Sequence, residues 1–138
     1  MVVGILREIR EWGGLARTAE LLRAGYPDEV IRVCARYGVI VHVCHGWWAA
    51  PGLDPDVARA RQLGGRLACV SAIEQQGQAV IRPLQLHIEL GRSGKRPSDT
   101  SVVVHWRRRR SPGDRQAVSI EAARGQARVC QQALSGTL

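Results

Sequence analysis

Four consecutive arginines form the densest run of charge in the chain, in the motif HWRRRR. Guanidinium groups in such a run can neutralise several phosphates, and binding of this kind weakens steeply as the salt concentration rises. The same run is also typical of a solvated strand end, or of a surface that meets an acidic protein. The candidate phosphate contacts are Arg107, Arg108, Arg109 and Arg110.

A second set of charged residues lies on a predicted helix over residues 27–37. Arg32 and Arg36 are four residues apart and share a face with Glu29, because an α-helix repeats every 3.6 residues. Arginine can bind a guanine edge and glutamate can accept from cytosine, each worth about 1–3 kcal/mol of discrimination. The candidate DNA contacts of this helix are Asp28, Glu29, Arg32 and Arg36, although the charges of Asp28 and Glu29 count against DNA because they would face phosphates. The alternative is a surface helix with weak exposed ion pairs.

Cysteine and histidine side chains crowd the hairpin that is predicted after this helix. A zinc site could be drawn from Cys34, His42, Cys44 and His45. Zinc sites usually use closely paired ligands, and the chain contains no CxxC pair, which favours buried thiols and an ordinary strand histidine. We therefore expect no metal and no cofactor. His45, at the turn, is instead a candidate contact to the DNA backbone.

Residues that could support catalysis are scattered. His87 and His105 are expected on neighbouring strands, and Ser71 and Glu74 on a helix. The chain contains no GxSxG motif, no phosphate-binding glycine loop and no HExxH motif. No catalytic residue is predicted, and the chain is not expected to be an enzyme.

Periodicity and glycine positions predict the elements of the first half. Helices are expected over residues 2–12, 15–24 and 27–37, because apolar residues recur at helical spacing and a glycine ends each one. From Val39 the period changes to two, and His45-Gly46 is a plausible tight turn. Three short helices followed by a hairpin predict a winged helix-turn-helix, in which the helix over residues 27–37 enters the major groove.

The predicted third helix has an apolar side that we expect to pack into the core. The residues expected on that side are Val30, Val33, Cys34 and Tyr37. The charged side would then face solvent and DNA. Arg17 and Thr18, together with the hairpin tip, would hold the DNA backbone.

A second unit is predicted after Pro51. It comprises a helix over residues 55–63, a turn and short helix over 64–77, strands over 84–90 and 101–106, and a final helix over 118–134. The final helix has Ala123, Ala127 and Cys130 on one side. We therefore predict an α+β protein, with a winged-helix DNA-binding domain over residues 1–52 and a small α+β domain over residues 53–138.

The composition favours an anionic partner. The chain has 138 residues, 45% of them hydrophobic, and a formal net charge of +8. Lys95 is the only lysine, and the arginine fork suits phosphates and guanine edges, although a GC-rich genome would also favour arginine. No apolar run reaches the roughly 20 residues of a membrane-spanning helix. The first residues lack a signal-peptide pattern. A cytoplasmic monomer or homodimer is expected.

The stretch GGLARTAELLRAGYPDEVIRVCARYGVIVHVCHGWWAAPG resembles the N-terminal winged helix of AbiEi-type antitoxins. The same module begins actinobacterial and phage proteins, some of them fused to a Vsr-like nuclease domain. The shared landmarks are Leu21, Leu22, Gly25, Gly38, Gly46, Trp48 and Pro51. The segments LGGRLACVSAIEQQG, LQLHIEL and VVVHWRR resemble the part that follows the winged helix in the nuclease-fused relatives. The resemblance implies DNA binding, commonly at a repeat in the protein's own promoter.

The chain departs from this family in three places. Relatives often carry basic residues in the wing, where this chain has His42, Cys44 and His45. They often begin the third helix with Ser or Thr, where this chain has PDE at residues 27–29. Nothing that resembles a nuclease core follows residue 134, so nuclease activity is not expected.

These observations together predict a regulator that binds double-stranded DNA at a specific sequence. It would be a repressor that works without catalysis, either a phage immunity repressor or an autoregulating antitoxin. The alternative is a protein-interaction module, an antitoxin that neutralises a toxin partner through its C-terminal half.

Overall fold

The computed structural model describes residues 2–78, 85–91, 94–98, 101–107, 109 and 111–136. The chain divides into two compact units, Met1–Ala58 and Arg59–Leu138. The sequence predicted a division after residue 52, which is six residues before the observed one. Residue 52 lies in the turn before helix α4 (Pro55–Gln62). The two units divide within this helix, which has buried residues on both sides of the division, Val57 and Ala60.

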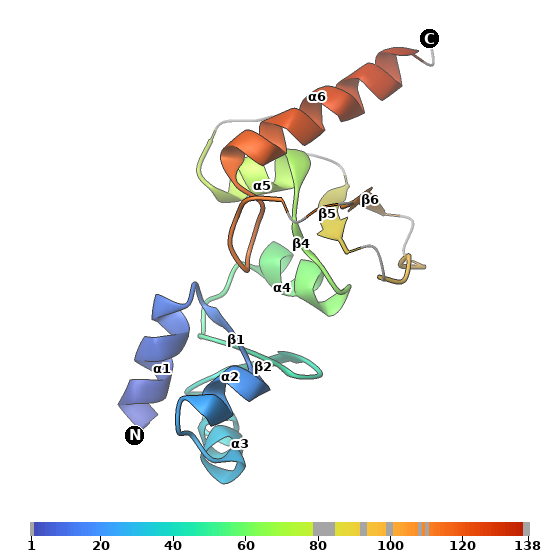
Figure 1. The fold of residues 1–138 in the computed structure, drawn as a ribbon. Helices are drawn as coiled ribbons and strands as arrows, with labels where there is room; N and C mark the ends of the chain where they lie inside the picture. Colours follow the sequence, from blue (N-terminus) through green and yellow to red (C-terminus); the bar gives the residue numbers. More distant parts are fainter. Residues whose placement is uncertain are drawn as a thin grey trace. The chain divides into compact units, whose positions relative to one another are not determined.

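The first unit has three helices and one small sheet (Figure 1). Its elements are α1 (Val2–Glu11), β1 (Leu15–Arg17), α2 (Thr18–Arg23), α3 (Asp28–Arg36), β2 (Val41–Cys44) and β3 (Trp47–Ala49). The strands are antiparallel in the order β1-β3-β2, so that β3 lies in the middle of the sheet. Gly46 turns the hairpin with a φ of +80°, a conformation that glycine adopts without strain.

Residues 15–17 form a strand where the sequence predicted the start of a helix. Leu15 pairs with Ala49, and Arg17 pairs with Trp47. The spacing of the apolar residues from Leu15 onward fits a helix as well as a strand, and the pairing strand β3 lies about 30 residues further along the chain. The prediction was wrong for these three residues because strand formation depends on such neighbours more than on local pattern.

Helix α3 turns a different side to the core than predicted. Ile31 and Cys34 are fully buried, whereas Val33 is 44% exposed and Tyr37 is 78% exposed. The predicted burial of Val33 and Tyr37 was therefore wrong. Apolar residues occur at four of five consecutive positions, 30, 31, 33 and 34, so the spacing does not decide which side is buried. Packing against the rest of the first unit decides it, in a core that includes Ile5, Ile9, Leu21, Ile31, Cys34 and Ile40.

The second unit places two helices beside a three-stranded sheet. After α4, its elements are β4 (Arg66–Leu67), α5 (Cys69–Gln75), β5 (Leu86–Leu90), β6 (Val102–Trp106) and α6 (Ile120–Gly136). The strand order is β4-β5-β6, with β4 antiparallel to β5 and β6 parallel to it. Helix α6 lies across α5, and its C-terminal part extends beyond α5 (Figure 1).

The chain is an α+β protein, which confirms the predicted class. In β4, Arg66 and Leu67 form a strand where a turn was predicted, because they pair with Glu89 and Ile88 of β5. Within the described part of the chain, no helix is both long and apolar enough to cross a membrane.

Candidate nucleic-acid interface and Cys-His cluster

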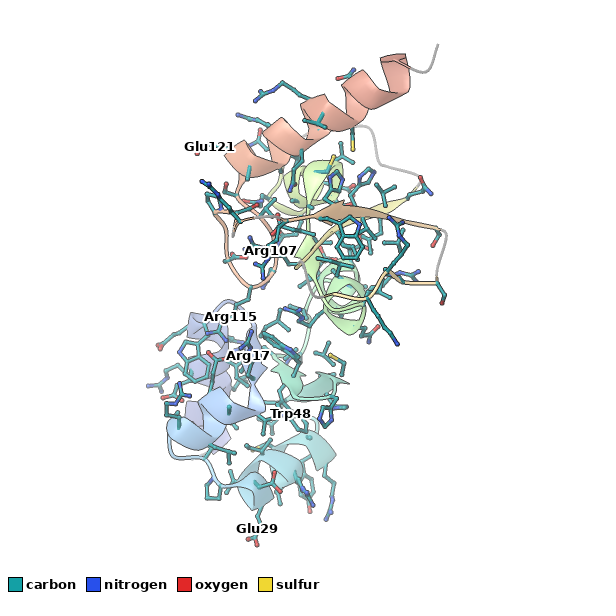
Figure 2. The ribbon with its side chains drawn as sticks, turned by 45° about the vertical axis from the view of Figure 1, so that its right-hand side comes forward. Arg17, Glu29, Trp48, Arg107, Arg115 and Glu121 are labelled. Atoms are coloured by element: carbon teal, nitrogen blue, oxygen red, sulfur yellow. The ribbon has the colours of Figure 1, made fainter. Side chains whose placement is uncertain are left out.

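Helix α3 exposes all four of the side chains that the sequence assigned to it as DNA contacts. They are Asp28, Glu29, Arg32 and Arg36. Figure 2 shows Glu29 on the outer side of α3, pointing away from the rest of its unit. Arg32 Nε lies 2.9 Å from Asp28 Oδ2, and the two side chains are 73% and 55% exposed. An exposed helical pair contributes only about 0.3–0.5 kcal/mol, so Arg32 can exchange this partner at little cost.

Two apolar side chains that sequence reasoning assigned to the core also lie on this surface. With Glu29, Arg32 and Arg36, the exposed Val33 and Tyr37 make up what we call the outer face of α3. All five positions lie within one side of a helix with 3.6 residues per turn. The outer face therefore offers guanidinium groups, a carboxylate and apolar contact area together. It differs from the predicted charged face by the addition of the two apolar side chains.

Arg17 and Thr18 hold the start of α2 against the hairpin. The guanidinium carbon of Arg17 lies 5.0 Å from the centroid of the Trp47 ring, and the Arg17 backbone N–H donates to Glu20 Oε1 at 2.9 Å. Thr18 Oγ1 accepts a hydrogen bond from Trp48 Nε1 at 2.8 Å. His45 is exposed at the turn, as expected for a hairpin tip. Arg17 and His45 are therefore exposed to solvent, whereas the Thr18 side chain fixes the position of the Trp48 indole.

The Thr18–Trp48 hydrogen bond gives a direct test of this positioning. Replacing the hydroxyl by a methyl in Thr18→Val leaves the half-buried indole N–H without its acceptor and should lower the free energy of unfolding by about 1 kcal/mol. Urea denaturation of the full chain measures the change. Thr18→Ser keeps the hydroxyl and is the control. A Thr18→Val variant that is as stable as the unmodified chain would show that this hydrogen bond does not contribute to stability.

The arginine run after β6 is only partly described. Arg107 is half-buried, and a Cβ atom built on Gly91 would lie 3.3 Å from its Nη2, so its guanidinium group lies close to the backbone of Gly91. Its backbone N–H donates to Leu90 O at 3.0 Å and continues the β5–β6 pairing. Arg109 is exposed. The predicted contacts Arg108 and Arg110 lie outside the described residues.

Four metal-ligand side chains meet in the second unit. Cys69, His87, His105 and Cys130 each present one ligand atom, and these atoms all lie within 4.8 Å of one another. His87 Nδ1 is 3.1 Å from His105 Nε2, and Cys130 Sγ is 3.6 Å from the same Nε2. Cys69 is fully buried and the other three residues are half-buried. We call these four residues the Cys-His cluster.

Each member of the Cys-His cluster comes from a different element. Cys69 begins α5, His87 is on β5, His105 is on β6 and Cys130 is on α6. The expectation that His87 and His105 lie on neighbouring strands is confirmed by the parallel β5–β6 pairing. A hydrogen bond from the backbone N–H of His87 to Ser71 Oγ, at 2.9 Å, ties β5 to α5. The cluster is therefore held by the packing of the whole unit.

A polar network surrounds the Cys-His cluster. The backbone N–H of Cys69 donates to Gln126 Oε1 at 2.9 Å, and Gln126 Nε2 donates to Glu89 Oε2 at 3.1 Å. Glu89 Oε1 in turn pairs with Arg66 Nη2 at 3.0 Å. The carboxylate and the amide thus fix the position of the Cys69 backbone.

Burial sets the protonation of the Cys-His cluster. Burial, together with the nearby His105 ring, lowers the pKa of His87 to about 4. Burial also lowers the pKa of His105, and the Glu89 carboxylate partly offsets this effect. Both rings are neutral at pH 7, the form in which imidazole binds metals. Burial raises the pKa of Cys69 to about 12, so this thiol keeps its proton unless a cation lies beside it.

The hairpin residues that could be drawn as a zinc site do not converge. Cys34 is buried in the core of the first unit, whereas His42 and His45 are exposed. Among the described residues, the Cys-His cluster is the one group of three or more potential ligands. Sequence reasoning missed this cluster because its members are far apart in the chain. The available signal was the pair of histidines on neighbouring strands.

The fold and these sites define an α+β protein of two units, one with a helix that exposes two arginines and two carboxylates and the other with the Cys-His cluster. No family model and no curated protein matches the chain. Among solved structures, it is similar to the crystal structure of the RV2827C protein from Mycobacterium tuberculosis, with 27% sequence identity and a TM-score of 0.40. The similarity covers 76% of this chain and 43% of that chain, so this chain spans less than half the length of that protein.

Proposed function

We propose that the chain is a sequence-specific DNA-binding transcriptional regulator, a repressor that acts without catalysis. The observation that carries this proposal is the exposure of Arg32 and Arg36 on α3, within the element order α1-β1-α2-α3-β2-β3. This order, with β3 between β1 and β2, supports the assignment of a winged helix-turn-helix. In such a domain the second helix of the motif, here α3, enters the major groove.

In this proposal the outer face of α3 reads base edges. Arg32 and Arg36 bind guanine, Glu29 accepts from cytosine, and Val33 can contact a thymine methyl group. Arg17 and the hairpin tip at His45 lie against the DNA backbone, and the net charge of +8 supplies the general attraction. Arg109, exposed after β6, adds a phosphate contact. Glu29 and Asp28 lower affinity for any site that brings a phosphate close to them.

The experiment that tests this function is a selection from random duplex DNA with the full chain, followed by a salt titration. We expect one enriched sequence, bound at least about 10³-fold more tightly than random duplex. The logarithm of the binding constant should fall linearly with the logarithm of the salt concentration, by about 0.9 for each phosphate contact. Absence of binding to any duplex at low salt would refute the proposal, and binding without an enriched sequence would refute base reading by α3.

A second candidate function is supported by exposed apolar side chains in the second unit. Trp106 is 41% exposed and Val129 is 66% exposed, and both lie in a strongly basic chain. The exposed apolar side chains favour a protein partner, and the net charge of +8 favours an acidic one. An antitoxin that neutralises a toxin with its C-terminal half would have both properties. Co-purification with the product of the adjacent gene tests this function. Val129→Asp should weaken that complex without changing DNA binding, and a complex insensitive to Val129→Asp and Trp106→Ala would exclude this surface.

A further inference from the structure

We propose that the Cys-His cluster binds one zinc ion as a structural site, with Cys69, His87, His105 and Cys130 as its ligands. The observation is the convergence of two thiols and two imidazole nitrogens from four separate elements. This inference does not depend on DNA binding, because all four residues belong to the second unit.

The geometry fits a tetrahedral ion. Zinc lies about 2.3 Å from sulfur and 2.0–2.1 Å from nitrogen, so ligand atoms at the corners of a tetrahedron are about 3.3–3.8 Å apart. The distances here are 3.1 Å between His87 Nδ1 and His105 Nε2, and 3.6 Å from that Nε2 to Cys130 Sγ. All four ligand atoms lie within 4.8 Å of one another, so side-chain movements of about 1 Å bring them to tetrahedral spacing.

The composition of the ligand set argues for zinc over harder cations. Calcium and magnesium prefer oxygen ligands, and the four converging atoms are sulfur and nitrogen. Two thiolates balance the two charges of Zn²⁺ while the imidazoles stay neutral. The loaded cluster would then be electrically neutral, which is the condition for burying ions at low cost. Each thiol releases its proton to solvent as its sulfur binds the ion.

Four protein ligands leave no open position, so the site would be structural and not catalytic. Its ligands connect α5, β5, β6 and α6. The packing of helix α6 would be stabilised most by the ion, because Cys130 is only half-buried and its neighbour Val129 is largely exposed. The ion would therefore hold α6 to the sheet and contribute directly to the stability of the second unit.

Cys69 is oriented for this role by its backbone. Its φ of +53° lies in the left-handed region, which is strained for a non-glycine residue and tends to occur at functional sites. The hydrogen bond from its N–H to Gln126 maintains that conformation. Gln126 is thus a positioning residue and Glu89, which binds Gln126, supports it.

The test begins with the unmodified full chain, purified without chelators under reducing conditions. We expect about one zinc ion per chain by elemental analysis. Replacing zinc by Co²⁺ should produce the intense visible bands of a tetrahedral ion and a thiolate-to-cobalt charge-transfer band. This spectrum does not depend on whether any variant folds. A chain that holds no zinc after incubation with it, or an octahedral Co²⁺ spectrum without the charge-transfer band, would overturn the proposal.

Variants then assign the ligands. Cys69→Ser and Cys130→Ser should each weaken zinc binding by more than about 100-fold, beyond the loss usual for residues that only support ligands. Cys44→Ser, in the hairpin of the first unit, is the matched control and should bind zinc like the unmodified chain. Equal weakening by Cys44→Ser, or a Cys69–Cys130 disulfide that persists under reducing conditions, would overturn the assignment.

Discussion

Replacing Arg32 and Arg36 together by alanine should abolish the preference for the selected DNA sequence while leaving weak binding to any duplex. Each arginine that binds a guanine contributes about 1–3 kcal/mol of discrimination, so each loss should cost roughly tenfold to a hundredfold in relative affinity. Both side chains are exposed on α3, and the substitution of Arg32 removes its ion pair with Asp28. Binding constants for selected and scrambled duplexes, measured at several salt concentrations, provide the result.

A matched pair of substitutions separates base reading from general attraction. Arg10→Ala with Arg124→Ala also removes two exposed positive charges, one from α1 and one from α6. This control should weaken binding to selected and scrambled DNA alike, or leave both unchanged. If the control erases the sequence preference as completely as the α3 pair, or if the α3 pair weakens all duplexes equally, α3 is not the helix that reads bases.

The three helices and the hairpin of the first unit were predictable because local signals agree there. A glycine stands at the end of each predicted helix, and His45-Gly46 stands at the hairpin turn. The elements that sequence reasoning missed, β1 and β4, are three and two residues long. Strands this short have no periodicity of their own. They exist because Leu15 meets Ala49 and Arg66 meets Glu89, and such pairings are not visible in local sequence.

The orientation of α3 shows a second limit of sequence patterns. Val33 was expected in the core because apolar residues surround it, yet it is exposed while Ile31 is fully buried. Rotation of a short helix by one position exchanges which apolar residues face inward, and only packing against other elements selects one. The positions of Arg32 and Arg36 were less sensitive to this error, because both remain exposed in the observed orientation.

The Cys-His cluster could not be predicted from spacing. Metal motifs are recognisable when ligands lie within one turn or hairpin, and here each ligand lies on its own element. Two parts of the pattern were nevertheless present: the two histidines on neighbouring strands, and Cys130 on the apolar side of the last helix. What was missing is the placement of α5, which brings Cys69 to them and which depends on the tertiary packing of the unit.

Replacing Arg66 by methionine should lower the free energy of unfolding of the second unit by about 3–5 kcal/mol. Arg66 and Glu89 form a buried ion pair, with side chains 10% and 2% exposed. Arg66 also donates to the backbone carbonyls of Ser111 at 2.6 Å and Asp114 at 2.8 Å. The substitution therefore leaves the Glu89 carboxylate without its cation and both carbonyls without this donor, while the hydrogen bond from Gln126 to Glu89 remains. Urea titration of the full chain at a fixed zinc concentration, followed by amide hydrogen exchange in residues 59–78 and 85–91, measures the loss.

Two further variants show whether the uncompensated charge is the cause. Arg124→Met makes the same exchange at an exposed position of α6 and should change stability by less than about 0.5 kcal/mol. Adding Glu89→Met to Arg66→Met removes the stranded carboxylate, and replacing both members of a buried pair by apolar groups costs far less than removing one. The double variant should therefore be more stable than Arg66→Met alone. If the double variant is less stable than Arg66→Met, the stability losses of the two substitutions add. Arg66 and Glu89 would then stabilise the unit through their separate hydrogen bonds, including the one from Gln126 to Glu89.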